Sequence, residues 1–368
     1  MNIGADVKMA NQKYGEAWKS IKDAYDLLED KQSKQLFWAR MMADMDDESN
    51  CLKIFYQNSG KLQNTIRNEL KWTEQLASER CPVYIYGAKR LGKLIYTYLT
   101  EADIQIQAFV DRDYAAAESC CGIPVLSLEQ FCRECSLENG YVFIASVRAY
   151  QSILDDLKKC HFPQSRILPA LFQCNNVEEQ YFEFMEHMPP DGAFIDGGCY
   201  DCATSIAFAK RVYSKYSKII AFEPDQRNYR TCLNTFHIHP ELTAELIFAG
   251  LSSDTQILPF QINSQCPSSS KFDQNGKSYV KTVALDEVVG MQRVSFIKLD
   301  IEGFELNALI GARKTIQRDK PLCAICVYHN RGDMLSIMKY LSEIVPEYHF
   351  ALRHYTANMT ETVLYAFI

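Results

Sequence analysis

The sequence has no apolar run long enough to cross a lipid bilayer. The longest runs, such as Leu322 to Tyr328, have the length of a strand and fall far short of the ~20 residues that a membrane span needs. The N-terminal stretch MNIGADVKMANQKYG also lacks the apolar segment of a secretory signal peptide. We therefore expect a cytoplasmic protein without a membrane partner.

An excess of positive charge is lacking as well. The chain carries 39 Lys and Arg against 46 Asp and Glu, which gives a net charge of −7. Proteins that bind nucleic acids usually present a basic face, so we expect no nucleic-acid partner. With 368 residues, the chain is long enough for two or three domains.

Cysteine, in contrast, is abundant. The chain has 14 cysteines, and three pairs of them have the CxxC spacing of zinc and redox sites: Cys132/Cys135, Cys199/Cys202 and Cys323/Cys326. The last pair lies in a predicted strand, where residues three apart point to opposite faces. We therefore expect reduced thiols that pack as small apolar side chains, and no structural metal.

Residues 1–80 are predicted to form a helical segment. Two apolar stripes recur there at helical spacing, one at Trp18, Ile21, Tyr25 and Leu28 and the other at Leu62, Ile66 and Leu70. No catalytic constellation accompanies them. The segment could serve for packing, for a homodimer contact or as a substrate lid, and packing is the favoured interpretation.

Residues 81–172 are predicted to form a small Rossmann-like domain of the nucleotide-binding type. The strand Val83 to Ala88 leads into Gly87-Ala-Lys-Arg-Leu-Gly92, a dinucleotide fingerprint with Lys89 in place of its middle glycine. Asp111 ends the next strand, where an acidic residue would meet a ribose hydroxyl. The stretch FVDRD…GIPVLSLEQF resembles small domains that bind sugar nucleotides. A structural role is favoured, because the missing glycine would hinder the approach of a pyrophosphate.

Residues 173–368 are predicted to form a second α/β unit. Its alternation of strands and helices starts after Met188-Pro-Pro-Asp-Gly192. An apolar strand ends in Asp196-Gly-Gly198, and a helix is expected from about Thr204. The glycines let a ligand approach the backbone, and the helix N-terminus offers free N–H groups to an anion. The next strand ends in Glu223, which could accept both hydroxyls of an adenosyl ribose. This pair alone also fits a nicotinamide enzyme.

The downstream motifs distinguish a methyltransferase from a nicotinamide enzyme. The motifs FIDGGCYD, AFEPD, VKTVALDE, FIKLDIEGFELNALIGA and VYHNRGD…FALRHY…ETVLYAF resemble, in order, those of the FkbM family of methyltransferases. The resemblance implies a class I methyltransferase Rossmann-like sheet with a C-terminal antiparallel hairpin, in an α/β chain. It also implies S-adenosyl-L-methionine as the cofactor. Cys199 and Cys202 depart from the family pattern, which usually has small residues or glycine there.

The resemblance also implies roles for individual residues. The cofactor would be bound by the strand-end and loop residues Asp196, Gly198, Tyr200, Asp201, Thr204, Glu223 and Gly250. Asp300 and Glu302 resemble the family's acidic active-site pair, although a carboxylate at a helix start is also favourable for purely structural reasons. His329 and His354 end predicted strands, where a packing role and a catalytic role are about equally plausible.

Methyl transfer to a hydroxyl needs the attacking oxygen aligned behind the methyl group. The hydroxyl also benefits from a base with a pKa near the working pH. His329 is the first choice for this base and Asp300 the second. The products include a neutral thioether, so no metal is demanded, and a divalent ion held by Asp300, Glu302 and a histidine is left open. The favoured activity is O-methylation of a sugar, a glycan precursor or another small metabolite, by analogy only.

Two other functions remain as alternatives. A nucleotide-sugar-binding oxidoreductase would bind nicotinamide at Gly87 to Gly92, and Lys89 argues against it. A non-catalytic nucleotide-binding protein or scaffold would have lost its site, and the intact Asp196, Glu223 and Asp300 argue against that.

Overall fold

The computed structural model describes residues 18–45, 48–58, 81–101, 103–112, 119–134, 139–146, 149–168, 179–212, 216–263, 267–356 and 359–368. The chain divides into two compact units. The C-terminal unit comprises Met1–Asp44, Glu178–His354 and Thr360–Ile368, and the inserted unit comprises Met45–Val177 and Tyr355–Met359. The predicted helical segment 1–80 is thus divided at Asp44, and its second stripe lies outside the described residues. None of the described helices is long and apolar enough to cross a membrane.

The C-terminal unit is built on a seven-stranded sheet with the strand order β16-β17-β15-β14-β7-β8-β9. Five of its strands are parallel: β7 (Ala193–Gly197), β8 (Ile219–Phe222), β9 (Ala244–Ile247), β14 (Val294–Leu299) and β15 (Leu322–Cys326). β17 (Thr362–Phe367) runs antiparallel to both β15 and β16 (His349–His354). This arrangement confirms the predicted Rossmann-like sheet with a C-terminal antiparallel hairpin.

The central strands are buried along their whole length, which explains why they appear in the sequence as continuous apolar runs. Phe194 of β7 stacks on Phe208 and on Phe296 of β14, with ring centroids 4.3 and 4.8 Å apart. The helices of this unit are α9 (Ala203–Val212), α10 (Gln226–Ile238), α11 (Leu285–Val289), α12 (Glu305–Gly311), α13 (Arg313–Asp319) and α14 (Asp333–Ile344), with a 3₁₀ turn at Met185–His187.

The strand order reverses between β7 and β14. The chain proceeds from β7 to β8 and β9 on one side, and from β14 to β15 on the other. Gly197 is in register with Phe222 of β8 and with Leu299 of β14. The residues that follow these strands therefore lie together at the carboxyl edge of the sheet, where open α/β sheets bind their ligands.

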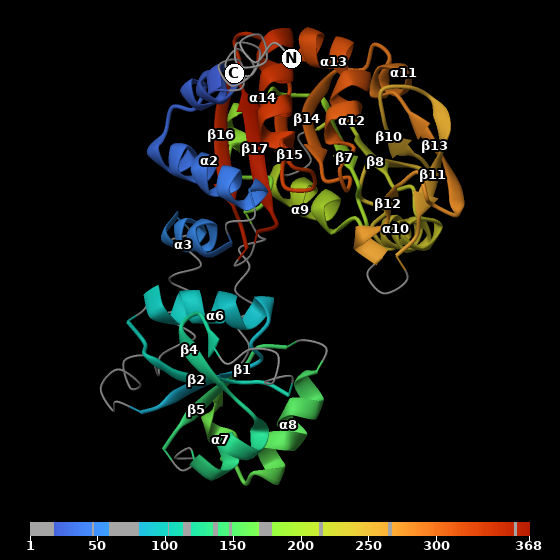
Figure 1. Ribbon diagram of the computed structural model, residues 1–368. Helices are drawn as coiled ribbons and strands as arrows, with labels where there is room; N and C mark the ends of the chain where they lie inside the picture. Colours follow the sequence, from blue (N-terminus) through green and yellow to red (C-terminus); the bar gives the residue numbers. More distant parts are fainter. Residues whose placement is uncertain are drawn as a thin grey trace, which may run out of the picture. The chain divides into compact units, whose positions relative to one another are not determined.

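A second, four-stranded sheet follows β9. Its order is β10-β13-β11-β12, and its strands are β10 (Gly250–Leu251), β11 (Gln256–Gln261), β12 (Lys271–Phe272) and β13 (Ser278–Val283), with a 3₁₀ turn at Pro267–Ser269. The sequence predicts one strand over about 242–250, but the chain forms two elements there, because β9 ends at Ile247 and β10 begins at Gly250. Figure 1 shows this small sheet at the opposite edge of the C-terminal unit from β16.

Helix α2 (Lys31–Asp44) packs against β16 at the other edge (Figure 1). The Ser33 hydroxyl accepts a hydrogen bond of 2.8 Å from the Leu352 N–H, and Arg353 forms an ion pair with Asp30 at 3.3 Å. The N-terminal helix is therefore part of this unit's packing, which was the favoured expectation for the helical segment.

The inserted unit has a six-stranded sheet of order β3-β4-β2-β1-β5-β6. Its strands are β1 (Val83–Tyr86), β2 (Ile106–Val110), β3 (Ser119–Cys120), β4 (Ile123–Leu126), β5 (Tyr141–Ile144) and β6 (Ile167–Leu168). All pairings are parallel except that of β3 with β4. Its helices are α3 (Glu48–Asn58), α6 (Arg90–Glu101), α7 (Leu128–Glu134) and α8 (Tyr150–Lys159), with a 3₁₀ turn at Gln164–Arg166.

The residues of the predicted dinucleotide fingerprint stabilise the turn in which they lie. Asp111 Oδ2 accepts a 2.7 Å hydrogen bond from the Ala88 N–H. A side chain at Gly92 would place its Cβ 1.8 Å from the Gly87 carbonyl oxygen, so this glycine is required by close packing. These contacts agree with the structural role favoured for this turn.

The inserted unit also contains a disulfide bond between Cys132 and Cys160. The expectation that all cysteines are reduced thiols is therefore wrong for this pair. The CxxC pattern gave no hint of it, because Cys160 lies 28 residues away in the sequence and approaches Cys132 only through the packing of the unit. Cys135, the other half of the predicted pair, lies outside the described residues.

Candidate active site

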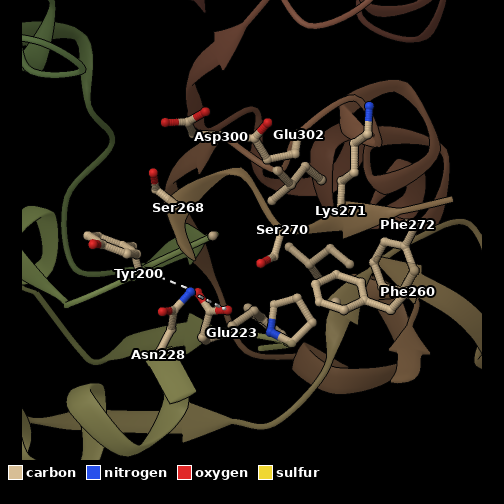
Figure 2. Close-up of a pocket in the computed structure, with 16 residues that line it drawn as sticks. Tyr200, Glu223, Asn228, Phe260, Ser268, Ser270, Lys271, Phe272, Asp300 and Glu302 are labelled. Atoms are coloured by element: carbon tan, nitrogen blue, oxygen red, sulfur yellow. Dashed lines mark hydrogen bonds between the residues drawn. The ribbon is translucent and has the colours of Figure 1, made fainter. Parts of the chain in front are cut away.

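A pocket opens at the carboxyl edge of the seven-stranded sheet. It is lined by the ends of β7, β8 and β14 and by the small sheet, through Gly198, Tyr200, Phe222, Glu223, Pro224, Asn228, Gly250, Leu251, Phe260, Ser268, Ser270, Lys271, Phe272, Asp300, Ile301 and Glu302. Figure 2 shows Glu223 and Asn228 on one side of the pocket and Asp300 and Glu302 on the other. Two acidic sites thus face one cavity from separate strands.

The loop after β7 has an unusual backbone. Gly198, Tyr200 and Cys202 all have positive φ angles, of 73°, 53° and 65°. A Cβ at Gly198 would lie 2.0 Å from the Asp300 carbonyl oxygen, so only glycine lets the β7 and β14 loops approach each other this closely. The loop therefore packs directly beside Asp300.

Glu223 binds this loop to the start of α10. Its Oε2 accepts from the Tyr200 N–H at 3.1 Å, and its Oε1 accepts from the Asp225 N–H at 2.8 Å. The side chain is 5% exposed, and burial raises its pKa to about 7, although the N–H donors of Asp225 and Tyr200 oppose the shift. The carboxylate therefore gains or loses its charge near neutral pH.

The small sheet lines the Glu223 side of the pocket with aromatic rings. Phe272 packs edge-on against Phe260, with centroids 5.1 Å apart, and lies 4.7 Å from the Phe304 ring. A Cβ at Gly250 would lie 2.5 Å from the Phe272 ring, so the glycine makes room for this aromatic wall. Together with Pro224 and Leu251, these rings give the Glu223 side of the pocket an apolar lining.

The opposite side of the pocket is a dense polar cluster. Asp300 Oδ2 accepts a 2.8 Å hydrogen bond from the Tyr181 hydroxyl, and Oδ1 accepts one of 3.4 Å from the Tyr328 hydroxyl. Burial would raise the pKa of Asp300, but Lys298 and His329 hold it below its ordinary value. Burial raises the pKa of Glu302 to about 7.

His329 lies behind the two carboxylates. Its Nδ1 is 2.9 Å from Glu305 Oε1, and its Nε2 is 3.5 Å from Asp300 Oδ1 and 3.8 Å from Glu302 Oε2. Burial alone would lower the pKa of His329, but these three carboxylates raise it to about 9. Asp300, Glu302 and His329 are therefore brought together, as the sequence predicted, although His329 does not line the pocket.

Comparison with known proteins identifies the domain that holds this site. Residues 196–352 match the family model of the methyltransferase FkbM domain. The C-terminal half carries an FkbM methyltransferase domain. Among curated proteins, none matches the chain.

Solved structures of methyltransferases resemble the chain in part. Methyltransferase FkbM from Methylobacillus flagellatus KT has 18% identity and a TM-score of 0.46, over 80% of this chain and 93% of that one. An rRNA methylase from Streptococcus thermophilus has 14% identity and a TM-score of 0.33, over 49% of this chain and 88% of that one. Fibrillarin from Aeropyrum pernix with bound S-adenosyl-L-methionine has 12% identity and a TM-score of 0.31, over 48% of this chain and 66% of that one. These likenesses assign no role to any residue here.

In the FkbM domain, Asp196 points away from the pocket. Its side chain is fully buried, forms an ion pair with Lys298 Nζ at 3.1 Å and accepts a 2.7 Å hydrogen bond from the Ser205 hydroxyl. Lys298 also donates to the carbonyl oxygens of Gly197 and Gly198, at 3.0 and 2.7 Å. Asp196 therefore acts on the glycine loop through Lys298 and does not face a ligand.

Two further predicted cofactor residues shape the start of α9. Asp201 Oδ1 accepts a 2.9 Å hydrogen bond from the Ala203 N–H, which satisfies a donor at the helix start. Thr204 is half-buried in the first turn. Neither residue lines the pocket.

His354 does not converge with Asp300 and His329 as predicted. It faces Thr362 across the β16–β17 ladder, and its Nδ1 lies 3.0 Å from the Thr362 hydroxyl. β16 is the edge strand, and β17 separates it from β15. His354 does lie at the same edge of the sheet as His329, but two strands away from it and outside the pocket lining.

Several residues of the polar cluster are absent from the sequence prediction. The Gln180 amide donates to the Tyr181 hydroxyl and to Glu361, and the Tyr328 hydroxyl donates to Glu361 at 3.0 Å. Glu305 is fully buried beneath His329. Glu305, Tyr328 and Glu361 lie inside the motifs that resemble the FkbM family, so the sequence did offer a signal for them. Gln180 and Tyr181 lie before β7, outside every quoted motif.

The CxxC pair of the glycine loop gains a third member in the fold. Cys232 of α10 lies 3.5 Å from Cys199, sulfur to sulfur, and all three thiols are buried beneath the loop. Their packing fits the expectation of small apolar side chains, and the absence of a structural metal here stays a prediction.

Proposed function

We propose that the FkbM domain binds S-adenosyl-L-methionine and methylates a hydroxyl group of a sugar, a glycan precursor or another small metabolite. The observation that carries this proposal is the pocket with Glu223 on one side and Asp300 with Glu302 on the other. We assign one side of this pocket to a nucleoside and the other to an acceptor.

The Glu223 side fits the adenosyl group. A carboxylate that ends the second strand of such a sheet can accept both ribose hydroxyls. Phe272, Pro224 and Leu251 offer an apolar lining to a purine. Tyr200, Gly198 and Gly250 line the same side, so these residues are our candidates for cofactor contacts.

The acidic side fits an acceptor hydroxyl. The cofactor supplies a methyl group on a sulfonium, which leaves as a neutral thioether when the new oxygen–carbon bond forms. Both oxygens of Asp300 already accept hydrogen bonds from tyrosines, so Asp300 can orient the acceptor. We assign the hydroxyl proton to Glu302, which lines the pocket beside Asp300. His329, the first choice from the sequence, lies behind both and reaches the acceptor only through them.

Calorimetry with S-adenosylhomocysteine tests the cofactor assignment, and one site per chain is the expected result. Mass spectrometry of the purified protein for retained nucleotides is an independent check. A protein that neither binds S-adenosylhomocysteine nor transfers a labelled methyl group to any hydroxyl-bearing acceptor would refute the proposal.

A further inference from the structure

One nitrogen of His329 is buried without a hydrogen bond. The side chain is 8% exposed, and among the described residues its Nε2 has no hydrogen-bond partner. This atom points between Asp300 Oδ1, at 3.5 Å, and Glu302 Oε2, at 3.8 Å. A buried polar atom of this kind is rare in a native fold and calls for a ligand.

Glu305 determines which way the imidazole ring presents that nitrogen. Its Oε1 accepts from the Ile301 N–H at 2.9 Å and lies 2.9 Å from His329 Nδ1. The fully buried Glu305 carboxylate accepts a hydrogen bond from Nδ1–H, which leaves Nε2 facing Asp300 and Glu302. A cation that binds Nε2 displaces the proton from this nitrogen. This carboxylate–histidine arrangement is the one that orients histidines toward metal ions in proteins.

The charges around Nε2 favour a cation. Four carboxyl groups lie close enough to His329 or to one another to interact electrostatically: Asp300, Glu302, Glu305 and Glu361. The nearby Lys298, in contrast, binds Asp196 and the glycine loop. Ligand atoms held about 2.1 Å from one ion lie roughly 3.0 to 3.5 Å apart. Nε2 lies 3.5 Å from the nearer Asp300 oxygen and 3.8 Å from the nearer Glu302 oxygen, so the Glu302 side chain must move inward to complete a site.

We infer that Asp300, Glu302 and His329 bind one divalent transition-metal cation of the Mn²⁺ type. Two carboxylates with one imidazole suit such an ion better than Mg²⁺, which prefers oxygen ligands alone. Since Asp300 and Glu302 line the pocket, the open coordination positions would face the acceptor and take its hydroxyl oxygens. This second role rests on the proposed function and selects acceptors with adjacent hydroxyls, such as sugars.

Titration of the metal-free protein with Mn²⁺, followed by electron paramagnetic resonance of the free ion, tests the site without any turnover. We expect one Mn²⁺ per wild-type chain. Glu302→Gln and His329→Ala should each weaken binding at least about tenfold, and Glu305→Gln by roughly 10- to 100-fold, since it removes the carboxylate that orients the histidine. Glu343→Gln, an exposed acid of α14, is the matched control and should bind as the wild type does.

Two results would overturn the inference: no Mn²⁺ bound to the wild type at millimolar free ion, or equal binding by Glu302→Gln. Glu302 is 27% exposed, so this variant keeps the test decisive even if His329→Ala does not fold. Calorimetry with S-adenosylhomocysteine on the same metal-free samples separates the two proposals. Mn²⁺ binding without the nucleoside would refute only the proposed function, and the reverse would refute only the cation site.

Discussion

Replacing Glu223 tests the cofactor site most directly. Glu223→Ala removes the only carboxylate on the nucleoside side of the pocket, among the described lining residues. A hydrogen bond to a charged group contributes about 1.5 to 3 kcal/mol, so the Kd for S-adenosylhomocysteine should rise roughly 10- to 150-fold. Glu223→Gln keeps one acceptor oxygen and should lose less. Glu245→Ala, on the neighbouring strand at the surface, is the control and should bind normally.

The pKa of Glu223 adds a pH signature to this test. With a pKa of about 7, the ionised fraction rises from roughly a tenth at pH 6 to nine tenths at pH 8, so affinity should rise about tenfold over that range. The same shift has the opposite sign for folding. The folded carboxyl holds its proton more tightly than the unfolded one, so this group's contribution to stability falls as pH rises from about 4.5 to 7.

Calorimetry at the two pH values, with Glu223→Gln as the reference for titrations of the nucleoside itself, isolates this effect. The reasoning fails if Glu223→Ala binds within twofold of the wild type, or if the wild type and Glu223→Gln show the same pH dependence.

Three other perturbations have defined outcomes. Asp300→Asn should reduce turnover with any accepted substrate by about 100-fold or more, because Asp300 contacts the acceptor. The Kd for S-adenosylhomocysteine should stay within a few fold of the wild-type value. An equal loss of turnover and of cofactor affinity would place Asp300 at the cofactor instead. Gly198→Ala should lower the melting temperature by several degrees, since its Cβ would meet the Asp300 carbonyl at 2.0 Å, and normal melting would refute the close packing of these loops. Peptide mapping without reductant should find Cys132 joined to Cys160, and Cys160→Ser should cost about 3 kcal/mol of stability for a loop of this length, whereas free thiols at both positions would restore the reduced-thiol expectation.

The sheet of the FkbM domain could be predicted because its strands are buried on both faces. Such strands appear as apolar runs, and the polar residues that end them, such as Glu223 and Asp300, mark the ligand edge. The same logic misplaced Asp196, which belongs to the strand and lies in register with Lys298 of β14. A sequence does not show the register of strands a hundred residues apart, so this buried ion pair could not be predicted.

The polar cluster shows a similar limit. The LDIEG motif predicted Asp300 and Glu302, because acidic residues at a strand end are a local signal. Glu305 and Glu361 stand in the quoted motifs as well, but only the fold shows that they meet His329 and Asp300. Tyr181 joins the cluster from a segment outside every motif. His354 was grouped with them because its strand ends at the same edge, and only the strand order shows that β17 intervenes.

The division of the chain has a consequence for biosynthesis. Helix α2 precedes the inserted unit, yet Leu28 bridges to Phe350 and Asp44 accepts a hydrogen bond from the Gly332 N–H, across about 290 to 320 residues. As the ribosome releases the chain, the main segment of the inserted unit, 45–177, is complete early, whereas α2 must wait for nearly the last strand before it meets its partner. A fragment that begins at residue 173, the boundary expected from the sequence, would leave β16 without this cover and should be prone to aggregation.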